Sequence, residues 1–262
     1  MKLLIMRHGE TFWNTEGRLQ GQTDIPLNKN GILMAQSCGK GMKDVKVDLC
    51  VSSTLLRAAQ TAELCMAYNE GYSERSSGIC RSFTPSVHQS IVKAPCEKIR
   101  RACLSEYPGY EENTCEPFYY ITDDRLKEAG FGPWEGKICR GEGYNVPLEN
   151  FGVYWSEPDS PLITEGVERL TAVSQRVEES LKSYINDPLL KDKTVLFVVH
   201  GCVMRSILYL MNGKKKFSGR VSLNCEVMFA HPGEDVLLIE DGRKIFYDES
   251  MAHDYYATMV QE

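Results

Sequence analysis

The chain of 262 residues carries a net charge of −6, with 42% hydrophobic and 25% charged residues. This length accommodates one large α/β domain or two small ones, and the composition is ordinary for a water-soluble globular protein. The negative charge argues against nucleic acid or an acidic membrane as a partner, so an anionic substrate must be attracted by local groups. No apolar run is long enough to cross a bilayer or to form the core of a signal peptide, so we expect a cytoplasmic protein without a membrane partner.

The ten cysteines show none of the short spacings that are typical of zinc or redox motifs. Several stand in apolar stretches, where a free thiol behaves as a small hydrophobic side chain. We therefore expect reduced thiols, with neither a structural disulfide nor a metal site.

The chain begins with a short apolar run, Leu3 to Met6, that predicts a buried strand followed at once by a polar group. In α/β proteins, ligands bind at the carboxyl ends of strands. The guanidinium of Arg7 suits a phosphate, His8 is a candidate nucleophile toward phosphorus, and Gly9 permits close approach of backbone or ligand. A single histidine in this position can equally be a turn or core residue, so the rest of the chain has to decide.

The glycine- and amide-rich segment 16–28 should form a loop against the same pocket, which brings in Gln20 and Gly21. Asn28 is expected to cap a helix that ends near residues 39–41.

A second strand is expected within residues 45–51, followed by a helix that Thr54 caps and that ends at about residue 68. Arg57 then lies in the first turn of that helix, where unpaired N–H groups and the helix dipole already favour an anion. The alternative for an isolated arginine is a solvated surface position.

Residues 69–120 interrupt this alternation of strands and helices. The Gly-, Ser- and Glu-rich part, 69–78, predicts a loop, and Pro95 predicts a short helix through Leu104. A long insertion in a compact domain is often a lid or a binding segment. Its cations are interpreted as a solvated helix face rather than as substrate ligands: Lys98, Arg100 and Arg101.

Two acidic residues, Glu128 and Glu135, lie in a glycine- and proline-rich loop that follows a strand expected at residues 119–122. Residues 151–161, rich in aromatic residues and proline, are interpreted as another loop. An apolar stripe at every third or fourth position between residues 167 and 184 then predicts one long helix that covers a face of the sheet.

The clearest strand spans residues 194–199; it is continuous and β-branched and is therefore expected at the centre of the sheet. It ends in His200 and Gly201, and the residues from Cys202 to Met211 predict a helix. A second His-Gly pair thus follows a buried strand, which packing alone does not readily explain.

The tail predicts three edge strands separated by two glycine-containing turns. The strands span residues 226–231, 236–240 and 244–247, with turns at Pro232-Gly233 and Asp241-Gly242.

Four separated motifs, in this order, resemble those of the histidine phosphatase superfamily, the phosphoglycerate-mutase-like proteins of branch 1. They are Arg7-His8-Gly9-Glu10-Thr11 with Asn14, Ser52-Ser53 with Arg57 and Gln60-Thr61-Ala62, Leu126 and Glu128 with Glu135-Gly136, and His200-Gly201. The resemblance covers about residues 1 to 240, apart from the insertion. It implies a three-layer α/β/α sandwich with a mostly parallel sheet, formed by a single domain over residues 1–262 with an inserted cap or lid at 69–120.

The resemblance also implies roles in phosphoryl transfer. His8 attacks phosphorus in line as a neutral imidazole and becomes a phosphohistidine, while a backbone carbonyl holds the proton on its other ring nitrogen. Glu128 is the general acid and base, and Glu135 is expected to be structural. The substrate-binding set is Arg7, Asn14, Gln20, Gly21, Arg57, His200 and Gly201. Arg7, Arg57 and His200 also face the equatorial oxygens of the transition state and count as catalytic. No metal ion or cofactor is needed, because these groups neutralise the phosphoryl charge.

Three functions fit these motifs: a phosphatase acting on a small phosphorylated metabolite, a cofactor-dependent phosphoglycerate mutase, and a non-catalytic phospho-ligand sensor. Mutases of the family carry an arginine and a tyrosine just after the acid, whereas this chain has Ala129, Gly130 and Phe131 there, which favours hydrolysis. The complete catalytic set argues against a sensor. No motif identifies the metabolite or the oligomeric state.

Overall fold

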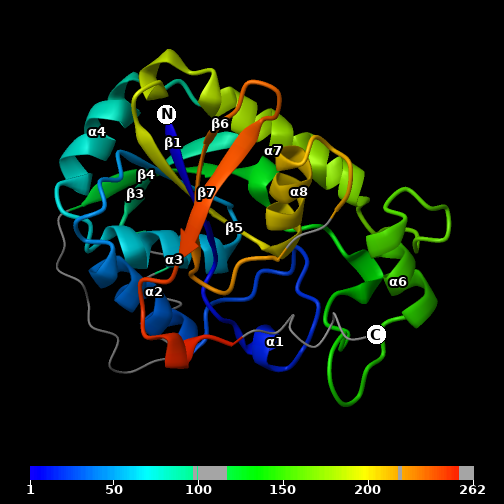
Figure 1. Cartoon of the computed structure of the whole chain (residues 1–262). Coiled ribbons are helices and arrows are strands. Elements are labelled where there is room, and N and C mark those ends of the chain that lie inside the picture. The colour runs from blue at the N-terminus through cyan, green and yellow to red at the C-terminus, as the bar shows by residue number, and fades with distance from the viewer. Residues whose placement is uncertain (97–98, 100–116, 218–219, 254–262) are drawn as a thin grey trace.

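The structure, a computed structural model, describes residues 1–96, 99, 117–217 and 220–253 (Figure 1). Its centre is one seven-stranded sheet with the strand order β3-β4-β2-β5-β1-β6-β7. The strands are β1 (Lys2–Arg7), β2 (Leu49–Ser52), β3 (Gln89–Ala94), β4 (Phe118–Asp123), β5 (Thr194–Val199), β6 (Val227–Pro232) and β7 (Leu238–Lys244). The α-helices are α1 (Phe12–Thr15), α2 (Lys29–Gly41), α3 (Leu56–Met66), α4 (Tyr72–Ser82), α6 (Leu148–Ser156), α7 (Leu170–Ile185) and α8 (Gly201–Met211). Single 3-10 turns are η1 (Asp124–Leu126), η2 (Gly132–Trp134), η3 (Pro188–Leu190) and η4 (Glu249–Met251).

The central four strands of the sheet, β4, β2, β5 and β1, are parallel. Strand β3 pairs antiparallel with β4 at one end, and β6 and β7 continue antiparallel from β1 at the other. The mostly parallel sheet expected from the sequence is therefore limited to its centre. Short turns such as the one between β6 and β7 join only antiparallel neighbours, whereas parallel neighbours require a longer crossover.

Helices cover both faces of the sheet, because side chains alternate between the faces along each strand. In β5, Val195, Phe197 and Val199 belong to one hydrophobic cluster, which also contains the buried apolar side chains of α7 and α8. Leu196 and Val198 belong to a second cluster, which contains those of α2 and α3. The three layers expected from the sequence are therefore present, with β5 at the middle of the sheet as predicted.

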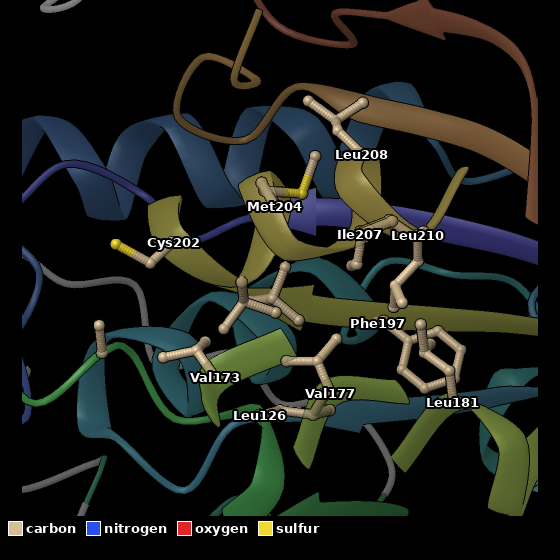
Figure 2. Close-up of a cluster of buried hydrophobic side chains, with 14 of the residues drawn as sticks. Leu126, Val173, Val177, Leu181, Phe197, Cys202, Met204, Ile207, Leu208 and Leu210 are labelled. Carbon is tan, nitrogen blue, oxygen red and sulfur yellow. The ribbon is translucent and has the colours of Figure 1, made fainter. Parts of the chain in front are cut away.

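From Leu170 on, the apolar stripe that predicted one long helix is the buried face of α7; Val167, the first residue of the stripe, lies before the helix begins. Val173, Val177 and Leu181 are all fully buried, and Figure 2 shows them in one cluster with Phe197 of β5 and Ile207 of α8. The stripe is structural, as the sequence predicted.

Two stretches interpreted as loops are helical. Residues 69–78 do not form a loop throughout, because α4 begins at Tyr72 and buries Tyr72, Ser76 and Ile79 on one face. Because Ser76 is polar, the buried face of this helix does not show an uninterrupted apolar periodicity in the sequence. The Tyr72 hydroxyl donates to the carbonyl oxygen of Tyr119 at 2.9 Å and accepts from the Cys50 N–H at 2.9 Å, so α4 is fastened to the sheet by long-range contacts.

The second misread stretch lies within 151–161, where α6 occupies residues up to Ser156. Its aromatic side chains recur at helical spacing: Phe151 and Trp155 are four residues apart and contact each other edge to face, and Tyr154 packs against Trp134 in the same way. Aromatic packing against the loop after β4 stabilises this helix.

The N-terminus of α3 is not capped by Thr54. The N-cap residue is Leu55, without a side-chain hydrogen bond, and Thr54 donates instead to Asp124 at 2.8 Å. Asp24, from the loop after β1, accepts the Leu56 N–H at 2.6 Å. A residue far away in the sequence therefore supplies the missing acceptor.

The tail forms two strands rather than three edge strands. Strand β6 pairs with β1 and β7, so of the two tail strands only β7 lies at an edge of the sheet. Asp241 and Gly242 lie within β7, where the register shifts opposite Phe229 and Ala230 as in a β-bulge, and residues 245–247 form no separate strand.

The insertion is described only in part. Its first half provides α4 and the edge strand β3. The helix predicted from Pro95 and the cations Lys98, Arg100 and Arg101 lie almost entirely outside the described residues. Within the part of the chain that the structure describes, no helix is long and apolar enough to span a membrane, and the cysteines there are free thiols.

Helix α3 carries a buried carboxyl group, Glu63, that is 7% exposed. One oxygen accepts from the Tyr120 hydroxyl at 2.9 Å and the other from the Cys96 N–H at 3.1 Å. Burial outweighs these hydrogen bonds and raises the pKa of Glu63 to about 7. Its proton is therefore bound more tightly in the folded than in the unfolded state.

This shift predicts a pH-dependent stability. Because the pKa of Glu63 in the folded state lies above the unfolded value, its contribution to the free energy of unfolding is fully present below about pH 4.5. That contribution is lost as the pH rises through about 7. Urea unfolding between pH 5 and 7.5 should show that the free energy of unfolding of the wild type falls by about 2 kcal/mol relative to that of Glu63→Gln. Parallel stability curves for the two proteins would contradict the assignment.

Candidate active site

The predicted catalytic residues follow the carboxyl ends of the four parallel strands. Arg7 ends β1, Arg57 lies in the first turn of α3 just after β2, Glu128 follows β4 and η1, and His200 follows β5. Figure 1 shows β1 running from the start of the chain toward the end of the molecule where α1 and α6 lie.

These elements enclose a cavity of about 70 Å³. The residues that line it and that the sequence predicted are Arg7, His8, Asn14, Gln20, Gly21, Arg57, Glu128 and Gly201. His200 does not itself line the cavity, but it is fully buried with its ring against that of His8. The structure therefore brings every predicted site residue together.

The backbone around His8 fixes its imidazole. Nδ1 lies 2.7 Å from the carbonyl oxygen of Gly9; because a carbonyl only accepts, Nδ1 carries the proton and Nε2 keeps its lone pair. A side chain at Gly9 would place its Cβ 2.7 Å from the carbonyl oxygen of Gly31, so the glycine is required for this close packing. Asn224 donates to the carbonyl oxygen of His8 at 2.6 Å.

The rings of His8 and His200 lie 5.1 Å apart and are tilted by 53°. Burial, then the charges of Arg57 and Arg7, hold the pKa of His8 well below its usual value against the opposing hydrogen bond to Gly9. Burial and the charge of Arg57 also lower the pKa of His200 strongly. Both imidazoles are therefore neutral at neutral pH, and neither nitrogen of His200 has a hydrogen-bond partner among the described residues.

Arg57 is fully buried and is held by the loop that follows β1. It donates to the carbonyl oxygens of Gly21 at 2.8 Å and Thr23 at 3.0 Å. Burial lowers its pKa to about 10, so the guanidinium stays charged at neutral pH. Arg7 is also buried and approaches the carbonyl oxygen of Ser222 at 3.5 Å.

The carboxylate of Glu128 meets the N-terminus of α8. Its Oε1 accepts from the backbone N–H groups of Cys202 at 3.0 Å and Ala129 at 2.9 Å. The backbone carbonyl of Glu128 accepts from Arg176 at 3.0 Å. Arg176 also donates to two neighbouring carbonyls and pairs with Glu168, so it supports the backbone of this loop; the sequence analysis missed it.

Glu135 is structural in its contacts. It accepts from the backbone N–H groups of Gln22, Thr23 and Phe131 at 2.9–3.0 Å and does not line the cavity. It ties the loop after β1 to the loop after β4, which fits the structural part that the sequence led us to expect for Glu135. Gly21 adopts φ +55, and a Cβ there would clash with Glu135 at 2.1 Å.

Asn14 takes part in a capping box at the start of α1. Its Oδ1 accepts from the N–H and hydroxyl of Thr11, both at 3.1 Å, so the amide NH₂ is the end left to donate into the cavity.

Further residues that line the cavity, some cationic and some aromatic or thiol-bearing, were not predicted from the sequence. Three are cationic, Arg18, Arg140 and Arg205, and the others include Phe131, Phe151, Trp155, Cys139 and Cys202. The segment 222–225, which supports the site from behind through Ser222 and Asn224, was not predicted either. Of these residues, Arg205 could have been predicted from the sequence, because it lies four residues after Gly201 and three after Cys202 and therefore shares their face of the helix. Among the described residues, no three His, Cys, Asp or Glu side chains are grouped to hold a metal ion.

The family model of the histidine phosphatase superfamily, branch 1, matches residues 3–80 and 113–235. The chain belongs to this superfamily. The unmatched stretch, 81–112, lies within the segment 69–120 that the sequence analysis interpreted as an insertion.

Known relatives of the chain carry two kinds of name. The 2,3-bisphosphoglycerate-dependent phosphoglycerate mutase of Protochlamydia amoebophila is 43% identical over 215 residues, which are 81% of this chain and 86% of the relative. The uncharacterized phosphatase PhoE of Bacillus subtilis is 47% identical over 64 residues, 24% of this chain and 33% of the relative. Among solved structures, Bacillus stearothermophilus YhfR matches with a TM-score of 0.62 at 24% identity, covering 92% of this chain and 95% of its own, which concerns the fold alone.

Proposed function

We propose that the protein is a phosphatase that hydrolyses a small phosphomonoester through a phosphohistidine on His8. The observation that carries the proposal is the contact between His8 Nδ1 and the Gly9 carbonyl at 2.7 Å, which leaves Nε2 as the nucleophilic nitrogen in an arginine-lined cavity. The lowered pKa of His8 keeps that nitrogen unprotonated at neutral pH.

In the first step, Nε2 of His8 forms a bond to phosphorus while the bond to the leaving oxygen breaks. Glu128, in its protonated form, gives its proton to that oxygen. In the second step, water attacks phosphorus, its proton passes to Glu128, and the P–N bond breaks to release inorganic phosphate. The enzyme returns to its starting state without an external co-reactant.

The charge that spreads over the equatorial oxygens is stabilised by Arg7 and Arg57, with Asn14 as a neutral donor. His200 is neutral in the free enzyme, packs against His8, and has no hydrogen-bond partner among the described residues; we infer that its ring donates to an oxygen of the phosphoryl group once that group is bound to His8. Donors in a buried site need no reorganisation during the reaction, and each is typically worth about 3–4 kcal/mol.

Hydrolysis is favoured over transfer by the residues just after Glu128. Ala129 is fully buried and Phe131 lines the cavity with an apolar surface, whereas mutases of the family carry an arginine and a tyrosine at these two positions. A cofactor-dependent phosphoglycerate mutase is the second candidate, and the name and 43% identity of the Protochlamydia amoebophila relative favour it.

A product assay separates the two candidates. The protein is incubated with 3-phosphoglycerate, with and without 2,3-bisphosphoglycerate, and free phosphate and 2-phosphoglycerate are both measured. We expect free phosphate as the main product in either case. Formation of 2-phosphoglycerate at a much higher rate, dependent on the bisphosphate, would establish the mutase instead.

A further inference from the structure

Arg176 on α7 lies next to the active site without lining the cavity, and it uses every N–H group of its guanidinium within the protein. Nε and Nη2 donate to the two carboxylate oxygens of Glu168 at 2.8 and 3.0 Å. The remaining donors reach backbone carbonyl oxygens, those of Arg125 at 2.7 Å, Lys127 at 2.6 Å and Glu128 at 3.0 Å. A guanidinium has five N–H groups, so none is left for a substrate.

Glu168, the partner of this arginine, is bonded to the same loop through its own backbone. Its Oε2 accepts from the Gly130 N–H at 2.9 Å, and its N–H donates to the Gly130 carbonyl oxygen at 2.7 Å. Its carbonyl oxygen accepts from the hydroxyl of Tyr154 on α6 at 3.2 Å. A two-point contact between a guanidinium and a carboxylate fixes the orientation of both groups. The Arg176–Glu168 pair therefore holds the loop 125–130 near both of its ends.

Helix α7 gives this pair a rigid base. Val173 and Val177, which lie on either side of Arg176 along the helix, are fully buried. Figure 2 shows them in one hydrophobic cluster with Leu126, near the start of the loop. Apolar packing thus fixes the first turn of the loop against α7, and the hydrogen bonds of the pair fix the residues that follow.

The loop carries the carboxylate that the proposed mechanism uses. Oε1 of Glu128 accepts from the N–H groups of Ala129 at 2.9 Å and Cys202 at 3.0 Å, and Oε2 lies 3.2 Å from the Cys202 nitrogen. One of these donors belongs to the loop and the other to the first turn of α8. The place of the carboxylate in the cavity therefore depends on where the loop lies relative to α8.

Removal of the pair would leave several backbone groups of the loop without their partners. Among the described contacts, the Glu128 carbonyl oxygen would keep only the side-chain amide of Gln22, at 3.1 Å. Backbone groups that lose their partners in a partly buried loop shift to reach water. A general acid must lie within hydrogen-bond reach of the leaving oxygen, and a displacement of about 1 Å can lower the rate about a hundredfold.

We propose that Arg176 and Glu168 are positioning residues for the general acid. Together they fix the loop 125–130, so that the carboxyl group of Glu128 stays on the N–H groups of Ala129 and Cys202 and reaches the leaving oxygen. The inference rests on the proposed function in one respect, namely that Glu128 transfers the proton.

A lysine at position 176 separates the geometry of the arginine from its charge. Burial and then the charge of Arg57 are the main causes that lower the pKa of His200, and the charge of Arg176 adds to them. Lysine keeps a positive charge. It has three donors on a single nitrogen, however, and cannot reproduce the planar fork that joins a carboxylate to three carbonyl oxygens.

Arg176→Lys should therefore impair proton donation more than the other parts of the reaction. We expect kcat/KM for an alkyl phosphate such as 3-phosphoglycerate to fall about tenfold to a hundredfold more than kcat/KM for p-nitrophenyl phosphate. A loss of folded protein alone would lower both values by the same factor. If Arg176→Lys does not fold, Glu168→Gln carries the same test, with a smaller change in the same direction.

A double-mutant cycle with Glu128→Gln shows whether the pair acts through Glu128. In the Glu128→Gln background, Arg176→Lys should lower the two kcat/KM values equally, because the proton donor is already absent. The same selective loss in both backgrounds would overturn the inference, as would an unchanged ratio of the two values in Arg176→Lys and Glu168→Gln.

Arg243→Lys is the matched control. Arg243 also donates to both carboxylate oxygens of a glutamate, Glu240, and to the carbonyl oxygen of Arg220, but it lies on β7 and does not line the cavity. Its side chain is 13% exposed, against 18% for Arg176. This variant should leave the ratio of the two kcat/KM values unchanged.

Amide hydrogen exchange decides the inference without turnover. If the wild type releases phosphate from no substrate, the proposed function fails, and exchange at Ala129 and Cys202 is then measured by NMR relative to the amides of β5. Exchange at least about tenfold faster in Arg176→Lys than in Arg243→Lys supports the positioning of the Glu128 carboxyl group. Equal exchange in the two variants overturns it.

Discussion

His8→Ala should lower phosphate release by about four orders of magnitude or more, because it removes the atom that accepts the phosphoryl group. The wild type, quenched during turnover of a ³²P-labelled substrate, should carry label that is lost in acid and retained in alkali, as expected for a phosphohistidine. The variant should carry none. Both measurements address the nitrogen that the Gly9 carbonyl orients.

His231→Ala is a suitable control, since His231 is a half-exposed histidine on β6 that pairs with Asp241 away from the cavity. It should retain both activity and label. Thermal unfolding of His8→Ala shows whether the variant is folded. Near-normal turnover in a folded His8→Ala protein would end the nucleophile assignment.

Glu128→Gln should slow the first-turnover release of a poor alkoxide leaving group by about 10²–10⁴-fold, the usual contribution of a positioned general acid. Release of p-nitrophenol should change far less, because p-nitrophenolate leaves without being protonated. Glutamine is close in size and its amide oxygen still accepts the N–H groups of Cys202 and Ala129, so the geometry of the loop is retained. Burst kinetics with both substrates give the comparison.

Glu135→Gln provides the contrast. Glu135 holds two loops together through backbone N–H groups and does not line the cavity. Its loss should therefore reduce the release of both leaving groups by a similar factor. If Glu128→Gln behaved in the same way, Glu128 would not be the proton donor.

The arrangement of the central residues could be predicted from the sequence, because it depends on a general property of parallel sheets. Arg7 ends a strand and Glu128 and His200 each follow one, and parallel strands bring their carboxyl ends to one edge. Each strand is recognisable from a few adjacent residues, as in the continuous run before His200. The predicted contact of His8 with a backbone carbonyl is also present, but that expectation came from the family resemblance.

The elements that were predicted wrongly from the sequence depend instead on contacts between distant parts of the chain. Helix α4 was hidden because Ser76 interrupts its buried face, and Tyr72 is held by partners in β2 and β4. The cap of α3 comes from Asp24 rather than from Thr54. In each case a partner distant in the chain decides the local structure, and no short sequence pattern encodes that partner.

The sequence by itself determined which residues could perform the chemistry and the strand ends from which they project, because hydrophobic periodicity and residue type act over a few neighbouring positions. Only the tertiary structure decided how the site is completed: Arg205 stacked on Trp155, Arg18 joined to the segment after Glu135, and Asn224 placed behind His8. All three contacts connect residues about 50 to more than 200 positions apart, and such pairings arise only when the whole sheet and its covering helices pack together.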